Sequence, residues 1–246
     1  MANWQEPHPA HVSPATAGAP GAARDAGLRS YMLSVYNYMA SGVLLTGIVA
    51  LLFAPYSQSV LVNASGTGMS GLGWLIVLAP LGFVFAMSFG FQRMQTGTLQ
   101  LLFWAFATVM GLSMSTVFLA YTNTSIAQAF FATAAAFAAL SLYGYTTKRD
   151  LSAIGTFLIM GVVGLIVALL VNMFLRSSAM ALAISVIGVL LFAGLTAYDT
   201  QRIKSMYLEV AGSDMQGKVV IMGALSLYLD FINMFQFLLS LMGNRR

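Results

Sequence analysis

The amino-acid sequence predicts an all-α integral membrane protein with seven transmembrane helices. Hydrophobic residues make up 59% of the 246-residue chain and charged residues only 7%, whereas a soluble globular domain usually carries about 25% charged residues. Seven apolar segments follow one another, each close to the ~20 residues that cross a hydrocarbon core. Backbone polar groups in hydrocarbon must be satisfied within their own segment, and the alternation typical of barrel strands is absent. The segments are therefore expected to be helices.

We expect an N-terminal tail before the helices. Residues 1–28 are rich in Ala, Pro and Gly and lack an apolar core long enough for a signal peptide, which predicts a disordered cytoplasmic tail. Residues 29–246 then form one transmembrane domain. Its predicted spans cover residues 31–54, 73–92, 98–120, 125–146, 152–174, 179–200 and 221–242.

The basic residues predict how the helices are oriented. The net charge is +4, but Lys and Arg occur singly or in pairs between apolar segments, which indicates membrane topology rather than nucleic-acid binding. With a cytoplasmic N-terminus, eight of them lie inside, namely Arg24, Arg29, Arg93, Lys148, Arg149, Arg202, Lys204 and Lys218. Three then lie outside, namely Arg176, Arg245 and Arg246. The excess favours this orientation with seven crossings, although a re-entrant last segment would return the C-terminus to the cytoplasm.

The residue types present exclude several kinds of cofactor site. The chain has no cysteine, and its two histidines, His8 and His11, both lie in the tail. Disulfides, thiolate metal ligands and a cysteine nucleophile are thereby excluded, and haem or iron–sulfur chemistry is not expected. We expect no bound cofactor, and calcium only as a permeant or bound ion.

Two aspartates within the last two apolar segments are the candidate functional residues. Asp199 lies in GVLLFAGLTAYDTQRIK and Asp230 in IMGALSLYLDFINMFQFLLSLM. A carboxylate at membrane depth costs about 2.5–3.5 kcal/mol on insertion scales, so each must pair, take up a proton or face water. Residues 200–207 contain no Pro or Gly, so the sixth helix should continue through them beyond the hydrocarbon boundary. Both aspartates would then lie at a similar depth, about 12–14 Å from the cytoplasmic helix ends.

The last segment also carries a stripe of polar residues. Its members recur at intervals of three and four and therefore share one helical face. They are Ser226, Asp230, Asn233, Gln236 and Ser240. Because a polar face is unfavourable toward lipid, the seventh helix should lie inside the bundle.

The aspartate pair predicts a pH-sensitive cation site. Two ionised carboxylates about 4 Å apart repel by about 4 kcal/mol at an effective dielectric of 20, so Asp199 and Asp230 should share one proton and titrate as a unit. Deprotonated, their oxygens are ligands suited to calcium. Arg93, at the inward end of the second segment, either snorkels to the headgroups or forms a latch that holds while the carboxylates are charged. The alternative for the aspartates is a structural role in fastening helices together.

The segments ALSLYLDFINMFQFLLSLMG at 224–243 and AYDTQRIKSMY at 197–207 resemble the Bax inhibitor family, also called the transmembrane Bax inhibitor motif family, in its bacterial YccA-like branch. The resemblance covers residues 29–243. It implies an inner-membrane protein whose last helix is wrapped by the other six, and a calcium leak that responds to pH. Asp199 and Asp230 match the family's sensor by motif, and Arg93 matches its latch by position. The acidic C-terminus of other relatives is replaced by two arginines.

Two other functions remain open at this point. Some bacterial members of the family are understood to restrain a membrane AAA protease, so the protein could be a membrane-embedded regulator without transport activity. Intramembrane aspartyl proteases also use aspartates on neighbouring helices, and Tyr198-Asp199 matches their tyrosine–aspartate pair. Their Gly-x-Gly-Asp sequence is replaced here by residues 227–230, Leu-Tyr-Leu-Asp, so we do not expect an enzyme.

Overall fold

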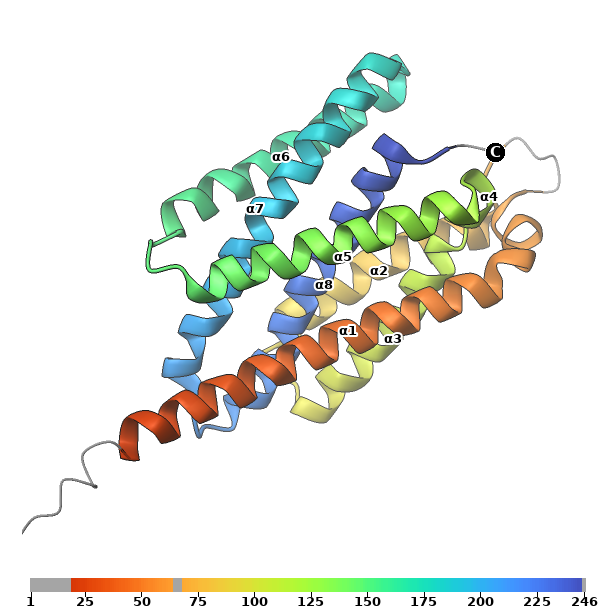
Figure 1. Ribbon diagram of the computed structural model, residues 1–246. Helices are drawn as coiled ribbons and strands as arrows, with labels where there is room; N and C mark the ends of the chain where they lie inside the picture. Colours follow the sequence, from red (N-terminus) through yellow and green to blue (C-terminus); the bar gives the residue numbers. More distant parts are fainter. Residues whose placement is uncertain (1–18, 64–67, 245–246) are drawn as a thin grey trace, which may run out of the picture.

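The structure, a computed structural model, describes residues 19–63 and 68–244 (Figure 1). Within these residues the chain forms eight helices, numbered in chain order. They are α1 (Ala19–Leu61), α2 (Gly71–Gly90), α3 (Thr96–Met114), α4 (Val117–Ala120), α5 (Asn123–Thr146), α6 (Ser152–Leu175), α7 (Ser178–Val210) and α8 (Met215–Met242). The short α4 continues the path of α3 across the membrane.

Seven of the described helical spans are long and apolar enough to cross a membrane, which confirms the predicted fold class. The protein is an integral membrane protein. The predicted boundaries agree most closely in the middle of the chain, where α5 and α6 begin and end within a few residues of the expected positions. The extension of the sixth span is also confirmed, because α7 continues to Val210 without interruption.

The first helix begins earlier than expected. Residues 1–18 of the predicted disordered tail lie outside the described residues, but residues 19–28 belong to α1. Pro20 lies in the first turn, where its fixed φ favours helix initiation, and alanine-rich sequence follows with high helix propensity. This segment packs on α7, where a Cβ added at Gly27 would collide with the Tyr207 side chain. Glycine here allows α1 to lie against the extension of α7.

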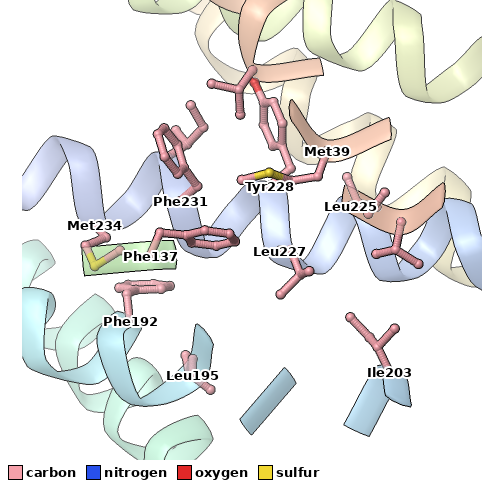
Figure 2. Packing of buried hydrophobic residues seen from close by; sticks show 14 of the residues in the cluster. Met39, Phe137, Phe192, Leu195, Ile203, Leu225, Leu227, Tyr228, Phe231 and Met234 are labelled. Atoms are coloured by element: carbon pink, nitrogen blue, oxygen red, sulfur yellow. The ribbon is translucent and has the colours of Figure 1, made fainter. Parts of the chain in front are cut away.

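α8 is the most buried of the spans. Buried residues make up 72% of its most apolar stretch, against at most 39% in any other described span. It packs closely against α1, α3, α5 and α7, and Figure 2 shows Leu227, Tyr228 and Phe231 of α8 among side chains from α1, α5 and α7. The interior position predicted from the polar stripe agrees with this burial. That all six other spans surround α8 stays a prediction.

One hydrogen-bonded chain fixes α8 against two neighbours. The Thr46 hydroxyl of α1 donates to the Ala107 carbonyl of α3 at 2.8 Å, so the Tyr228 hydroxyl of α8 donates to Thr46 Oγ1, at 2.6 Å. All three groups are buried. Because lipid offers no alternative partner, these bonds set the depth of α8 as well as its rotation.

The two ends of the bundle differ in charge. The start of α1 and the connections α2–α3, α5–α6 and α7–α8 share one end, which we call the basic end because it carries the eight residues predicted to lie inside. The C-terminal segment lies at the opposite end, where Asn244 N donates to Ser125 Oγ at 3.0 Å and Thr122 N donates to the Asn244 carbonyl. α8 therefore crosses completely rather than re-entering. Arg245 and Arg246 lie outside the described residues.

Candidate functional site

The contacts between α7 and α8 determine the relative depth of the two aspartates. A Cβ added at Gly223 on α8 would lie 3.3 Å from Ile203 on α7. Toward the other end of the bundle, Ser185 Oγ of α7 donates to Ser240 Oγ of α8 at 3.1 Å. The helices are antiparallel, so moving one residue toward the C-terminus on α7 corresponds to moving one residue toward the N-terminus on α8. Asp199 consequently lies level with Ser226.

This register corrects the prediction of equal depth. Asp230 lies four residues beyond Ser226 and so about 6 Å deeper than Asp199, at 1.5 Å per residue. The sequence-based estimate failed because α8 begins at Met215 rather than at residue 221. The two aspartates still lie on neighbouring helices, since α7 and α8 pack closely against each other.

Asp230 is one of the most enclosed polar groups in the protein. Its side chain is only 4% exposed, and Oδ2 is buried without a hydrogen-bond partner among the described residues. A buried polar oxygen without a partner costs about 1–3 kcal/mol. A helix-fastening role would use both oxygens in bonds to neighbouring helices, so the unpartnered Oδ2 agrees better with a group that takes up a proton or a cation.

Asp199 lines a cavity of about 240 Å³ between α2, α7 and α8. Its other polar lining residues are Ser88 of α2, Arg202 of α7 and Ser226 of α8. Phe91, in the turn after α2, and Gly223, which lies beside Ile203, also line it. A cavity with mostly apolar walls and four polar lining residues therefore reaches Asp199 from the basic half of the bundle, while Asp230 lies one helical turn beyond it.

The arginine that lines the cavity together with Asp199 is Arg202. It follows Asp199 by three residues, which places the two side chains on one face of α7, and among the residues that the structure describes the two form no ion pair. Arg93 lies in the turn 91–94 with an exposed side chain. Within the described part of the chain its guanidinium forms no ion pair with either aspartate. The latch role of Arg93 stays a prediction, and Arg202, expected only to mark the topology, occupies the position beside Asp199.

The rest of the predicted polar stripe is divided between two environments. Ser226 lines the cavity, and half-buried Asn233 donates its side-chain N–H to the Leu229 carbonyl one turn earlier at 2.8 Å. Gln236 is exposed, so the expectation that the whole stripe faces protein was wrong. Spacings of three and four residues place side chains on one face of α8, but they do not say how much of that face a neighbouring helix covers. Gln236 lies on the part of this face that α7 leaves uncovered. Ser88 was missed because an isolated serine in an apolar helix has no distinguishing pattern.

The oxygens at the cavity form an incomplete calcium site. Asp199, Ser88 and Ser226 border the cavity, and Asp230 adds an unpartnered oxygen deeper in the bundle. Calcium takes six to eight oxygen ligands, and among the described residues there is no group of three or more His, Cys, Asp or Glu that could hold a metal ion. This set of oxygens falls short of the ligand number that a bound calcium ion takes.

Comparison with known proteins assigns the chain to a family. The family model described as inhibitor of apoptosis-promoting Bax1 matches residues 28–246. The chain belongs to the Bax inhibitor family. This confirms the resemblance carried by the segments around Asp199 and Asp230, and the matched residues include residues of all seven spans.

Bacterial members of the Bax inhibitor family are similar to this chain over nearly its whole length. An uncharacterized protein of Rickettsia prowazekii is 50% identical over 223 residues, covering 90% of this chain and 92% of the relative. An uncharacterized protein of Caulobacter vibrioides is 45% identical, covering 90% and 91%. The inner membrane protein YbhL of Escherichia coli is 44% identical, covering 90% and 94%.

Proposed function

We propose that this Bax inhibitor family protein is a pH-sensitive, calcium-permeable leak of the bacterial inner membrane, gated by protonation of Asp199 and Asp230. The observation that carries the proposal is the position of these carboxylates. Asp230 is buried with an oxygen that has no partner among the described residues, and Asp199 lies about one turn nearer the basic end, where it lines a cavity together with Ser88, Arg202 and Ser226. A similar relative is an inner membrane protein, which supports the location.

The electrostatics of the pair support gating by protons. Like charges on facing helices repel each other in a medium of low dielectric, which disfavours the state with both carboxylates ionised. One proton held between them leaves a single negative charge, which Arg202 can neutralise. A second proton removes the attraction for Arg202. In this proposal the aspartates hold and release protons and attract cations, and they break no bonds.

Permeation requires a change in the helices around Asp230. The cavity reaches Asp199 from the basic end, whereas tightly packed residues of α8 and its neighbours close the path beyond Asp230. Releasing Arg202 would allow α7 to move relative to α8, because Gly223 places no side chain between α8 and Ile203 of α7. The N-terminus is cytoplasmic in this proposal, so the cavity faces the cytoplasm.

Calcium flux into proteoliposomes from pH 6 to pH 8 tests the proposal. We expect flux to rise as pH falls in the native protein, and to lose its pH dependence in the Asp199→Asn and Asp230→Asn variants and in the double variant. Asp150→Asn, in the exposed connection before α6, is the matched control and should behave as native. Unchanged pH dependence in the double variant would remove the sensor. An absence of flux in folded native protein would favour a regulator of another membrane protein, such as a membrane AAA protease.

A further inference from the structure

A second, larger cavity lies on the other side of α8, away from the aspartates. It has a volume of about 790 Å³ and is lined by α1, by α5 and by Phe231 of α8. We call it the lateral groove. α1 and α5 both pack on α8, which forms the floor, and the Phe130 and Phe137 rings of α5 lie 5.6 Å from the Phe231 ring. The groove is thus formed by helices that pack directly against one another in the bundle.

The lateral groove is long enough to cross one leaflet. On α1 its lining runs from Arg29 to Leu44, a rise of about 22 Å, against about 15 Å for half of a hydrocarbon core. A smaller cavity of about 300 Å³ shares Val43, Phe130 and Phe231 with it and continues toward the far end of the bundle. Any occupant that enters beside Arg29 can therefore lie along the helices down to the bilayer midplane.

The dimensions favour a flexible chain over a helix. A helix that crosses the bilayer is about 30 Å long and 10–12 Å wide with its side chains, so it takes more than about 2,000 Å³, well above the volume of the lateral groove. The walls are apolar, with Met32, Met39 and Leu142 among the lining residues. Methionine side chains adapt to irregular apolar surfaces. An acyl chain matches both the width and the chemistry of the groove.

Positive charge is concentrated at the basic end of the lateral groove. Arg29 lines it there, with an exposed side chain that forms no ion pair with a carboxylate within residues 19–63 and 68–244. Tyr145, on the opposite wall, is covered by Lys204, whose ammonium lies 4.8 Å from the ring centroid and donates to the Tyr145 carbonyl at 2.7 Å. An ammonium has three donors, so Lys204 can also contact a phosphate.

We propose that the lateral groove binds one anionic phospholipid of the surrounding bilayer. Its headgroup phosphate lies between Arg29 and Lys204, and one acyl chain runs along Met39 and Phe137 to Phe231. The proposal rests on the membrane location and on the groove, and not on the proposed calcium leak. Arg29 and Lys204 attract the anionic headgroup, and the apolar walls hold the chain.

Native mass spectrometry of the full-length protein tests this, after incubation with equal amounts of phosphatidylglycerol and phosphatidylcholine. We expect one phosphatidylglycerol to be retained in preference to phosphatidylcholine. Arg29→Gln should reduce this preference about fivefold, since one basic residue near an anionic membrane surface contributes on that scale. Arg24→Gln removes the same charge from the same helix outside the groove and should leave the preference unchanged.

Filling the groove gives an independent test. Ala138 is an exposed wall residue, so Ala138→Trp should block the acyl chain and lower the retention of both lipids severalfold without disturbing the fold. Ala183→Trp, on an exposed position of α7 away from the groove, should not. Equal retention in all variants would overturn the proposal. So would a dimer of native protein that Ala138→Trp abolishes while lipid binding persists, since the groove would then be an interface between copies.

Discussion

α6 and α8 are both long enough to cross the bilayer, yet they occupy opposite environments. α6 is the most apolar span, with a mean hydropathy of 2.8, and only 17% of its apolar stretch is buried. α8 is the least apolar, at 1.5, and 72% of its stretch is buried. In water the more apolar helix would be inside. In this membrane protein polarity, rather than hydrophobicity, marks the interior helix, because lipid is as apolar as a leucine side chain.

The largest effect is expected from a carboxylate introduced on α6, which would give this lipid-facing helix the polarity of α8. Val163 is 56% exposed in the middle of α6, so Val163→Asp places a charge toward lipid at a cost of about 2.5–3.5 kcal/mol. We expect a large fall in the fraction of membrane-inserted protein, measured by glycosylation mapping or protease protection. Val163→Leu should insert as native. Normal insertion of the aspartate variant would mean that α6 faces protein or water in the membrane.

Helix contacts in the interior should be more sensitive than the lipid face to added volume. A Cβ at Gly144 would collide with the Ala197 carbonyl, whereas one at Gly164 would meet nothing within 4 Å. Gly144→Val should therefore lower the free energy of unfolding by about 2 kcal/mol, the usual scale of overpacking. Gly164→Val should change it little. Thermal unfolding in detergent measures both, and equal destabilisation would contradict the packing of α5 on α7.

Arg202 and Arg93 are the two candidate latch residues, and removing the charge of each in turn distinguishes them. Arg202→Gln should raise calcium flux at pH 8 about threefold to tenfold, because it removes the cation beside Asp199, and the increase should shrink at pH 6 and in high salt. Lys148→Gln, an exposed residue of the same end, is the control. A larger increase in Arg93→Gln than in Arg202→Gln would show that the family's latch position acts in this chain.

The smallest effect is expected outside the membrane. Hydrogen bonds from the Ser152 side chain and backbone N–H hold the pKa of Asp150 below its usual value of 3.8. A lowered pKa in the folded state stabilises the protein above the unfolded pKa, and this contribution disappears as pH falls through the folded pKa. Asp150→Asn should therefore be slightly less stable than native at pH 7 and equal to it below about pH 3. Unfolding midpoints across pH check this, and a difference that persists in acid would contradict it.

Much of the fold could be predicted from the sequence because the bilayer sets the length of each helix. The continuation of α7 through residues 200–207 followed from the absence of Pro and Gly there. The start of α1 could not be predicted in this way, because residues 19–28 become helical partly through packing on Tyr207. Helix boundaries that depend on a distant partner are not visible in the local pattern.

The candidate site was predictable in its residues but not in its geometry. A carboxylate in an apolar segment is conspicuous, so Asp199 and Asp230 could be found from composition alone. Their offset by one turn depends on where α8 begins and on the contact of Gly223 with Ile203. Arg202 could have been singled out by its spacing of three from Asp199. Ser88 could not, because its role comes from the approach of α2 to α7 and α8.

The shared proton of Asp199 and Asp230 is the central claim, and infrared difference spectroscopy of the reconstituted protein measures it most directly. Titration from pH 8 to pH 6 should show the carbonyl stretch of a protonated carboxylic acid in the native protein. Asp199→Asn and Asp230→Asn should each change this band, and the double variant should lack it. A titration without any such band in the native protein, or a band that survives in the double variant, would contradict the account.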